Sequence, residues 1–212
     1  MRNFEYDKLK QKCWNNEILN LVAQIHECKG RQDIYLHRHP HQFDRLIEIA
    51  KIQSSVTANA TEGIQTTSTR LHQLATGKTA PRTADEEKIL GYWNALSIIN
   101  ESFNSIPIQP GSFAQLHQKL FPYGSTSSSG QFKTIQNDIQ AADSLGNTSV
   151  RFTPLSSVKT SMALQSIYDE LIHALAKKEV DALLVIPIFI HDFLWIHPFY
   201  QNFFANSFGG LS

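Results

Sequence analysis

The residue best placed for acid–base chemistry is His197, which opens the stretch His197-Pro198-Phe199 after an unbroken apolar run from Leu183 to Ile190. Because proline cannot continue a regular helix, this pattern predicts a buried segment that ends with a histidine at the mouth of a turn. The pKa of a histidine suits it to take a proton from a hydroxyl group near neutral pH. The stretch therefore indicates a candidate general base at His197.

This stretch resembles the signature of the Fic family, whose enzymes typically transfer AMP from ATP to protein hydroxyls. The signature begins His-Pro-Phe-x and continues with an acidic residue and Gly-Asn-Gly-Arg. The resemblance implies that His197 is the catalytic base and that Pro198 and Phe199 belong to the signature loop. It also implies ATP and Mg²⁺ as the cofactors of the family.

The residues after Tyr200 depart from the signature. Gln201 stands where the family has the acidic residue that holds the cation, and Asn202 to Phe204 replace the glycine-rich amides that surround phosphate. No arginine follows Arg151 to neutralise phosphate charge. From these replacements we expect no metal ligand here and doubtful binding of ATP and Mg²⁺. Losing one preorganised donor costs on the order of a hundredfold in rate. We therefore also expect no AMP transfer.

Glu62-Gly63 matches the end of the inhibitory motif that many Fic proteins carry on a helix before the catalytic core. Ala58 stands where that motif has serine or threonine, so the match is partial. In the family, the glutamate pairs with an arginine beyond the signature and obstructs the γ-phosphate of ATP. The alternative is a solvated carboxylate at a helix end, with Gly63 ending the helix. The context of the signature favours the inhibitory role.

Residues 131–135 alternate like a short strand after a run of serine and glycine, with residues 150–152 as the candidate partner strand. Phe132, Lys133 and Asn137 resemble the flap of Fic proteins, a hairpin that docks the target peptide by strand addition. An extended edge can offer backbone hydrogen bonds to a peptide of any sequence. The alternative is a mobile loop with a short hairpin.

Apolar residues at helical spacing predict a mainly α-helical fold. The resemblance makes this a Fic-like helical bundle with a short β-hairpin flap and with its last core helices missing. We expect an N-terminal helical region with the inhibitory-type helix over residues 1–65, an incomplete Fic-like domain over 66–200, and an unrelated tail over 201–212.

Local signals place the helix ends. Asn15 or Asn16 predicts the start of the first helix and Gly30 its end. Later starts are predicted at Ser112, at Ser156 or Ser157, and at Asp181.

Thr83 and Glu86 predict a capping box after a polar connection over 66–82. The box opens a long helix that places four apolar residues in the core: Leu90, Trp93, Leu96 and Phe103. Pro187 predicts a kink in the last helix or a start near Pro187 itself.

Composition excludes several classes of protein. Lysine plus arginine equals aspartate plus glutamate, so no nucleic-acid partner is evident, and no apolar run approaches the roughly 20 residues that span a bilayer. Cys13 and Cys28 favour free thiols in a cytoplasmic protein. His37, His39 and His41 alternate as metal ligands can, but no cysteine or carboxylate cluster accompanies them.

The partners of the chain stay open at this level. The resemblance implies an unidentified protein substrate, and a homo- or hetero-oligomer is compatible with the pattern. Two non-enzymatic alternatives are a helical interaction or regulatory module that binds a full-length relative, and the product of a decayed gene.

Overall fold

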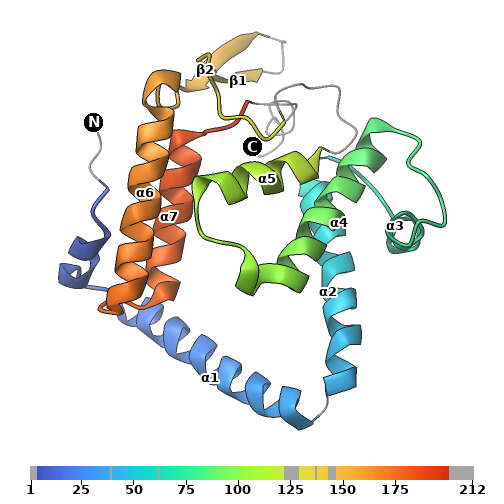
Figure 1. Ribbon diagram of the computed structural model, residues 1–212, viewed down its shortest axis with the longest axis horizontal. Coiled ribbons are helices and arrows are strands. Elements are labelled where there is room, and N and C mark those ends of the chain that lie inside the picture. Colours follow the sequence, from blue (N-terminus) through green and yellow to red (C-terminus); the bar gives the residue numbers. More distant parts are fainter. Residues whose placement is uncertain are drawn as a thin grey trace.

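The computed structural model describes residues 4–38, 40–61, 63–121, 129–136, 138–142 and 147–200. The fold is mainly α-helical, as predicted (Figure 1). The helices are α1 (Asn16–Arg38), α2 (Pro40–Thr61), α3 (Ser68–Ala75), α4 (Ala84–Ser102), α5 (Pro110–Leu120), α6 (Ser157–Lys177) and α7 (Ala182–Ile196), with 3-10 turns η1 (Tyr6–Gln11) and η2 (Phe103–Ser105), and the strands are β1 (Ile139–Ala142) and β2 (Thr148–Phe152). Within the described residues, no helix combines the length and the apolar character that crossing a membrane requires.

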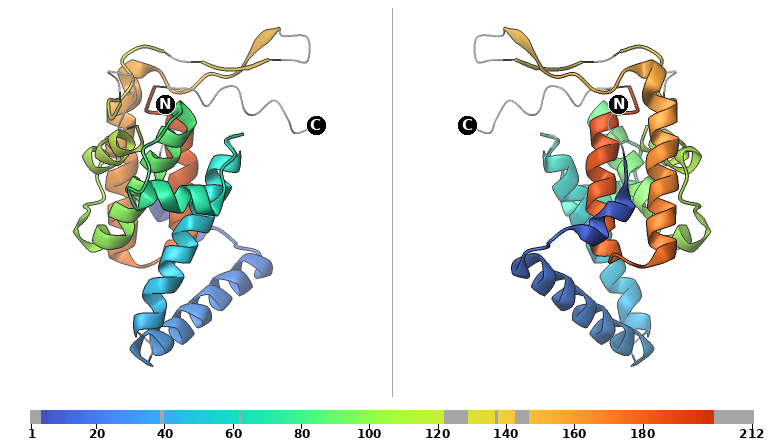
Figure 2. Two further views of the ribbon diagram at one scale, coloured as in Figure 1. Left: turned by 90° about the vertical axis from the view of Figure 1, so that its right-hand side faces the viewer. Right: turned by 90° about the vertical axis from the view of Figure 1, so that its left-hand side faces the viewer.

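Helices α6 and α7 lie side by side and bury the larger hydrophobic core (Figures 1 and 2). On each helix, residues three or four positions apart lie on one face, and these two faces pack against each other. The buried side chains include Leu164, Ile167 and Leu171 of α6 and Val185, Phe189 and Ile196 of α7. The apolar run that ends at His197 is therefore a core helix, as the sequence predicts.

The start of α7 is set by its cap. The side chain of Asp181 accepts a hydrogen bond from the backbone N–H of Leu183 at 2.9 Å, which confirms Asp181 as the N-cap. The helix continues through Pro187, so the alternative of a start near Pro187 is wrong. The cap begins the helix one turn earlier, and Pro187 is exposed in the second turn, where its ring does not disturb the core.

The N-terminal segment docks onto this helical pair. Phe4 and Tyr6 are buried in the same core. The backbone N–H of Tyr6 donates to Oε2 of Glu170 at 3.0 Å, and its hydroxyl donates to Oδ2 of Asp192 at 3.2 Å. These bonds tie the start of the chain to both α6 and α7.

A second, smaller core has Ile64, Leu71, Ile89 and Trp93 buried in it, and Ile52 and Val56 of α2 pack against it, so it joins α2, α3 and α4. The polar connection predicted for residues 66–82 is wrong, because α3 lies within it. The hydroxyl of Thr67 accepts from the N–H of Arg70 at 3.1 Å and caps this helix. Its buried leucines are too few for a helical period to stand out in a polar stretch.

Three predicted details of helix ends and core differ in the structure. Gly30 lies inside α1, not at its end, because one glycine costs only about 1 kcal/mol and the helix has long continuations on both sides. Helix α5 begins at Pro110, a residue with φ already fixed for a first helical position, so Ser112 does not cap it. Phe103 is 65% exposed because α4 has already ended at Ser102.

The capping box at the start of α4 forms only in part. The hydroxyl of Thr83 accepts from the N–H of Glu86 at 3.2 Å, as predicted. The carboxylate of Glu86 instead accepts from the N–H of Arg82 and from the guanidinium of Arg70, each at 2.7 Å. These bonds hold the pKa of Glu86 down at about 2, chiefly through Arg70.

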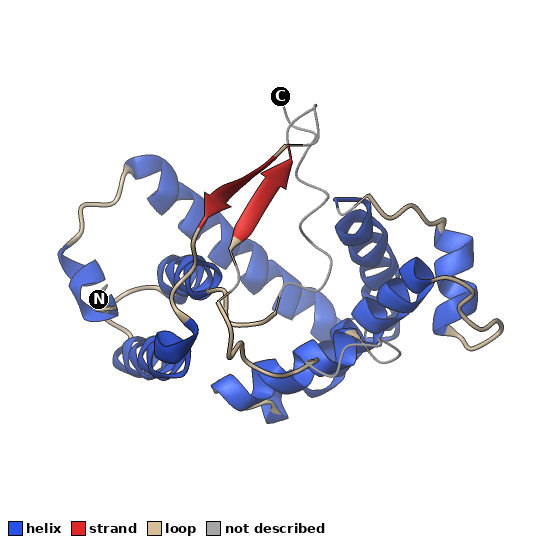
Figure 3. Cartoon of the chain, turned by 90° about the horizontal axis from the view of Figure 1, so that it is seen from above, coloured by secondary structure: helices blue, strands red, loops and turns tan. Residues whose placement is uncertain are grey.

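The predicted hairpin partners are corrected by the structure. Strands β1 and β2 pair antiparallel with each other, so residues 150–152 face Ile139–Gln140 and not residues 131–135 (Figure 3). Phe132 instead forms an isolated antiparallel bridge with Phe199. Phe132 thus pairs with a segment 67 residues further along the chain, and a local sequence pattern does not reveal so distant a partner.

Candidate functional site

His197 ends α7 in a left-handed conformation. Its φ is +47°, and its backbone N–H donates to the carbonyl oxygen of Phe193 at 3.1 Å. Pro198 prevents the helix from continuing, so the chain leaves the helix axis at this residue. Burial lowers the pKa of the imidazole, and the charge of Lys133 lowers it further. The imidazole is therefore neutral near pH 7, which is the form that can accept a proton.

Lys133 is buried against the end of α7. Its Nζ donates to the carbonyl oxygen of Ile196 at 3.0 Å, and its backbone N–H donates to the carbonyl oxygen of Pro198 at 2.8 Å. A cation at a helix C-terminus satisfies a carbonyl that has no partner within the helix. Burial lowers the pKa of Lys133 to about 8. The residue thus fixes the turn on both sides of His197.

Two further contacts extend this pairing along the chain. The rings of Phe132 and Phe199 lie with centroids 5.3 Å apart. The hydroxyl of Tyr200 accepts from the N–H of Thr134 at 2.7 Å. The two segments therefore meet in one antiparallel bridge at Phe132 and Phe199, and the side chain of Tyr200 adds a contact to Thr134. The structure brings together Phe132, Lys133, His197, Pro198 and Phe199, which the sequence had singled out separately.

His117 of α5 belongs to this site, although the sequence analysis did not identify it. Its ring stacks on Phe199 with centroids 4.0 Å apart and planes 14° apart, and its Nδ1 accepts from the N–H of Gly130 at 3.1 Å. Nδ1 must then be unprotonated, and burial lowers the pKa of the ring accordingly. The signal available in the sequence was its position one turn after Phe113, on the inward face of α5.

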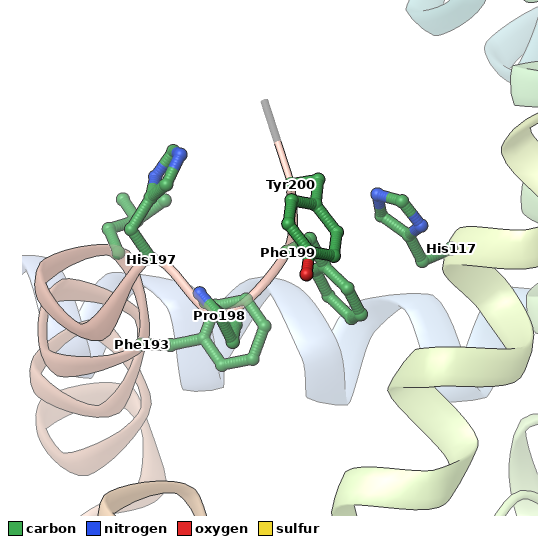
Figure 4. A pocket seen from close by; sticks show the side chains of 7 residues that line it. His117, Phe193, His197, Pro198, Phe199 and Tyr200 are labelled. Atoms are coloured by element: carbon green, nitrogen blue, oxygen red, sulfur yellow. The ribbon is translucent and has the colours of Figure 1, made fainter. Parts of the chain in front are cut away.

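A shallow pocket opens beside the turn. It is lined by His117, Phe193, Leu194, His197, Pro198, Phe199 and Tyr200. Figure 4 shows the imidazoles of His197 and His117 on opposite sides of Phe199 and Tyr200. The walls are mostly carbon, with the two imidazoles and the phenol as polar groups. This arrangement can accept a proton from a hydroxyl but offers no cluster of oxygen ligands.

The described residues contain no group of histidine, cysteine, aspartate or glutamate side chains arranged to hold a metal ion. Helix α1 runs through His37, and α2 begins at Pro40, so Pro40 marks a helix start and not a loop. His39 lies outside the described residues, as does the side chain of His41. The metal alternative gains no support from the part of the chain that is described.

The resemblance also singles out residues at the end of α2, after Lys133 and after Tyr200. Glu62, Asn137 and residues 201–212 lie outside the described residues. Gly63 is described: its φ is +78°, its N–H donates to the carbonyl oxygen of Ala60, and the N–H of Ile64 donates to that of Asn59, each at 3.0 Å. Paired bonds of this kind end a helix at a glycine. Gly63 therefore terminates α2.

Two solved structures with the same fold are Fic proteins. A Fic domain containing signaling protein from Bacteroides thetaiotaomicron superposes with a TM-score of 0.64 at 17% identity, covering 79% of this chain and 63% of that one. A Fic family protein from Desulfovibrio desulfuricans superposes with a TM-score of 0.65 at 19% identity, covering 92% of this chain and 56% of that one. The chain therefore has the fold of Fic proteins, and it spans about three fifths of the length of these two neighbours.

Comparison of the sequence itself gives no match, either to a protein-family model or to a curated protein. The likeness that the comparisons show is therefore one of tertiary structure.

Proposed function

We propose that this chain carries a Fic-type site for AMP transfer to a protein hydroxyl. In this proposal the site keeps its target side, the residues around His197 that receive the hydroxyl. It has lost its nucleotide side, the residues after Tyr200 that would bind ATP. Under this proposal the chain binds an extended peptide beside His197 but does not transfer AMP. The observation that supports it is the antiparallel bridge between Phe132 and Phe199, which with the hydrogen bond from Lys133 to Pro198 holds residues 132–133 beside the turn at His197.

The target side has the chemistry that a hydroxyl needs. His197 is neutral near pH 7 because of burial and the neighbouring cation, so it can accept a hydrogen bond from a serine, threonine or tyrosine side chain. Thr134, Ile135 and Gln136 are exposed, so a partner can reach this end of the segment. An extended peptide would gain backbone hydrogen bonds there irrespective of its sequence.

On the nucleotide side, the sequence lacks the residue types that the family signature has for the cation and the phosphates. By position in the signature, Gln201 replaces the acidic cation ligand and Ala205 replaces the arginine. Asn202 and Phe204 replace the two glycines, and Phe203 replaces the asparagine between them. A neutral amide holds Mg²⁺ poorly, and bulky side chains prevent backbone amides from surrounding phosphate. With cation, amides and arginine all affected, the expected rate of transfer is zero within detection.

The test is incorporation of label from ATP labelled at the α-phosphate, with Mg²⁺ and a cell extract as the source of targets. We expect no label on any protein with the native chain. Label that appears with the native chain and disappears with His197→Ala would contradict the loss of transfer.

The binding half of the proposal has its own measurement. A library of extended peptides containing serine, threonine or tyrosine is screened for binding, and amide hydrogen exchange of the chain is followed with the best binder. Binding should slow exchange in residues 131–136 and should weaken in Lys133→Met, which loses the anchor of that segment. Protection confined to other parts of the chain would count against this docking site.

A further inference from the structure

Helix α1 is long and poorly covered. It has 23 residues, and not one of them is buried, although the structure describes all of α1. In proteins, helices of this length owe most of their stability to packing of an apolar face and little to intrinsic propensity. Figures 1 and 2 show α1 at the end of the molecule opposite to the β-strands.

The uncovered part of α1 has the pattern of a coiled-coil seam. Residues at alternating spacings of four and three lie in one line along a helix. On α1 this line, called the α1 seam below, is exposed at Leu21 (51%), Ile25 (49%) and Tyr35 (42%), with exposed Cys28 and Gln32 between them. An apolar line of this kind normally packs against a second helix.

The rest of the molecule contacts α1 along a neighbouring edge. Val22 and Leu36 are half-buried there. On the same edge, Nε2 of His26 lies 2.7 Å from Oδ2 of Asp181 at the start of α7. Val22, His26 and Leu36 therefore lie on a different strip of the helix from Leu21, Ile25 and Cys28.

The α1 seam is complementary to itself in reverse. Leu21 precedes Cys28 by as many residues as Tyr35 follows it, so a second α1 running antiparallel would place Leu21 opposite Tyr35 and Cys28 opposite Cys28. The charges agree with this direction. Glu17 lies in the first turn and Arg38 in the last, so each would meet its opposite at the ends of the pair.

We propose that α1 pairs with α1 of a second copy of this chain, antiparallel, across a two-fold axis at Cys28. Such an interface is isologous, since the same residues are used by both copies. The pair leaves the pocket at His197 open in both copies, because α1 lies at the other end of α7 (Figure 1). The inference does not depend on the function proposed for that pocket.

The size of the contact sets the expected strength. At 1.5 Å per residue, α1 is about 34 Å long. One pair of helices of this length buries less than the roughly 800 Å² per partner of a standard interface. We therefore expect a dimer that dissociates on dilution, not an obligate one.

Cys28 lies on the predicted two-fold axis, so its thiol can be used to detect the pairing of two copies. Mild oxidation with copper phenanthroline converts two facing thiols to one disulfide, and the oxidant takes up the two electrons while two protons are released. Cys13→Ser, which keeps only Cys28, should give a covalent dimer on a non-reducing gel. Cys28→Ser, which keeps only the exposed Cys13, is the matched control and should stay monomeric. Equal cross-linking of the two variants would overturn the proposal.

Sedimentation velocity over a range of concentrations measures the dimer directly. Ile25→Asp should raise the dissociation constant by at least tenfold, whereas Ile34→Asp should leave it unchanged, because Ile34 is more exposed (58%) and lies off the seam. A native chain that stays monomeric at every concentration, or equal effects of these two variants, would contradict the proposal.

Charge reversal separates antiparallel self-pairing from other contacts. Glu17→Arg and Arg38→Glu should each weaken the dimer, and the double variant should restore it. Within one copy these residues are about 31 Å apart along the helix, so they cannot compensate for each other there. Failure of the double variant to restore the dimer, with circular dichroism showing an intact fold, would exclude this pairing.

Discussion

Nζ of Lys133 donates a hydrogen bond at 3.0 Å to the carbonyl oxygen of Ile196, the last residue of α7 and the one before His197. The two residues are 63 positions apart in the chain. A buried ammonium group is costly unless it is hydrogen-bonded, and a terminal helix carbonyl has no partner within its helix. Each group therefore satisfies the other, and the conformation of His197 depends on a residue from a different segment.

Lys133→Met tests this anchor. Methionine keeps the length and apolar stem but removes the donor, and the lost hydrogen bond to a cation is worth about 1.5–3 kcal/mol before the relief of burying a charge is subtracted. We expect a net loss of stability of about 1 kcal/mol and faster amide exchange at residues 197–200. Lys119→Met, at an exposed position on α5, is the control and should change neither quantity.

The ring of His117 gives the site a dependence on pH. Burial lowers its pKa below the ordinary value of 6.5, so between the two pKa values the unfolded chain binds more protons than the folded one. The stability that the folded chain gains from keeping His117 neutral is fully present above pH 6.5 and falls as the pH is lowered toward the pKa of the folded state. Protonation also removes the acceptor for the N–H of Gly130.

The measurement is chemical denaturation between about pH 8 and pH 5, the range in which histidine changes charge. His117→Phe keeps an aromatic ring beside Phe199 and should lose about 1 kcal/mol at the upper pH through the missing hydrogen bond. The difference between the native chain and the variant should shrink as the pH falls. A difference that stays constant over this range would show that His117 does not carry the effect.

Gly130 and Gly63 form a matched pair for measuring close packing under the site. Both have positive φ, +77° and +78°, so alanine is strained by about 1–2 kcal/mol at either position. At Gly130 a Cβ would also lie 2.9 Å from the carbonyl oxygen of Ala114 and 2.9 Å from Cβ of Gln118, whereas at Gly63 nothing lies within 4 Å. We expect Gly130→Ala to be more destabilising than Gly63→Ala by at least about 1 kcal/mol in urea denaturation. Equal losses would mean that residues 129–130 move away from α5 without cost.

The contact of Tyr6 with Asp192 predicts that the N-terminal segment stabilises α7. Asp192 is buried, so removing the hydroxyl in Tyr6→Phe leaves its carboxylate with one donor fewer and should cost about 1.5 kcal/mol. Tyr6→Ala also removes a buried ring and should cost about 3–5 kcal/mol in total. Thermal and urea denaturation measure both values, and a Tyr6→Phe variant as stable as the native chain would contradict the importance of this bond.

The helices and their caps could be predicted because their signals are local. Asn15 and Asp181 accept hydrogen bonds at the starts of α1 and α7, as their residue types indicate, and the core residues of α6 follow helical spacing. Predictions failed where a local rule met a competing one. Helix α3 was missed in a polar stretch, and Gly30 was assigned to a helix end although the helix continues past it.

For the candidate site, the sequence by itself determined the residue types: a histidine before a proline at the end of an apolar helix, and Gln201 to Ala205 in place of the acidic residue and Gly-Asn-Gly-Arg after Tyr200. Only the tertiary structure decided which groups meet. It paired Phe132 with Phe199, placed Lys133 on the end of α7, and brought in His117 from α5. Caps and helical periods act over three or four residues, whereas these contacts join segments that approach only when the core has folded.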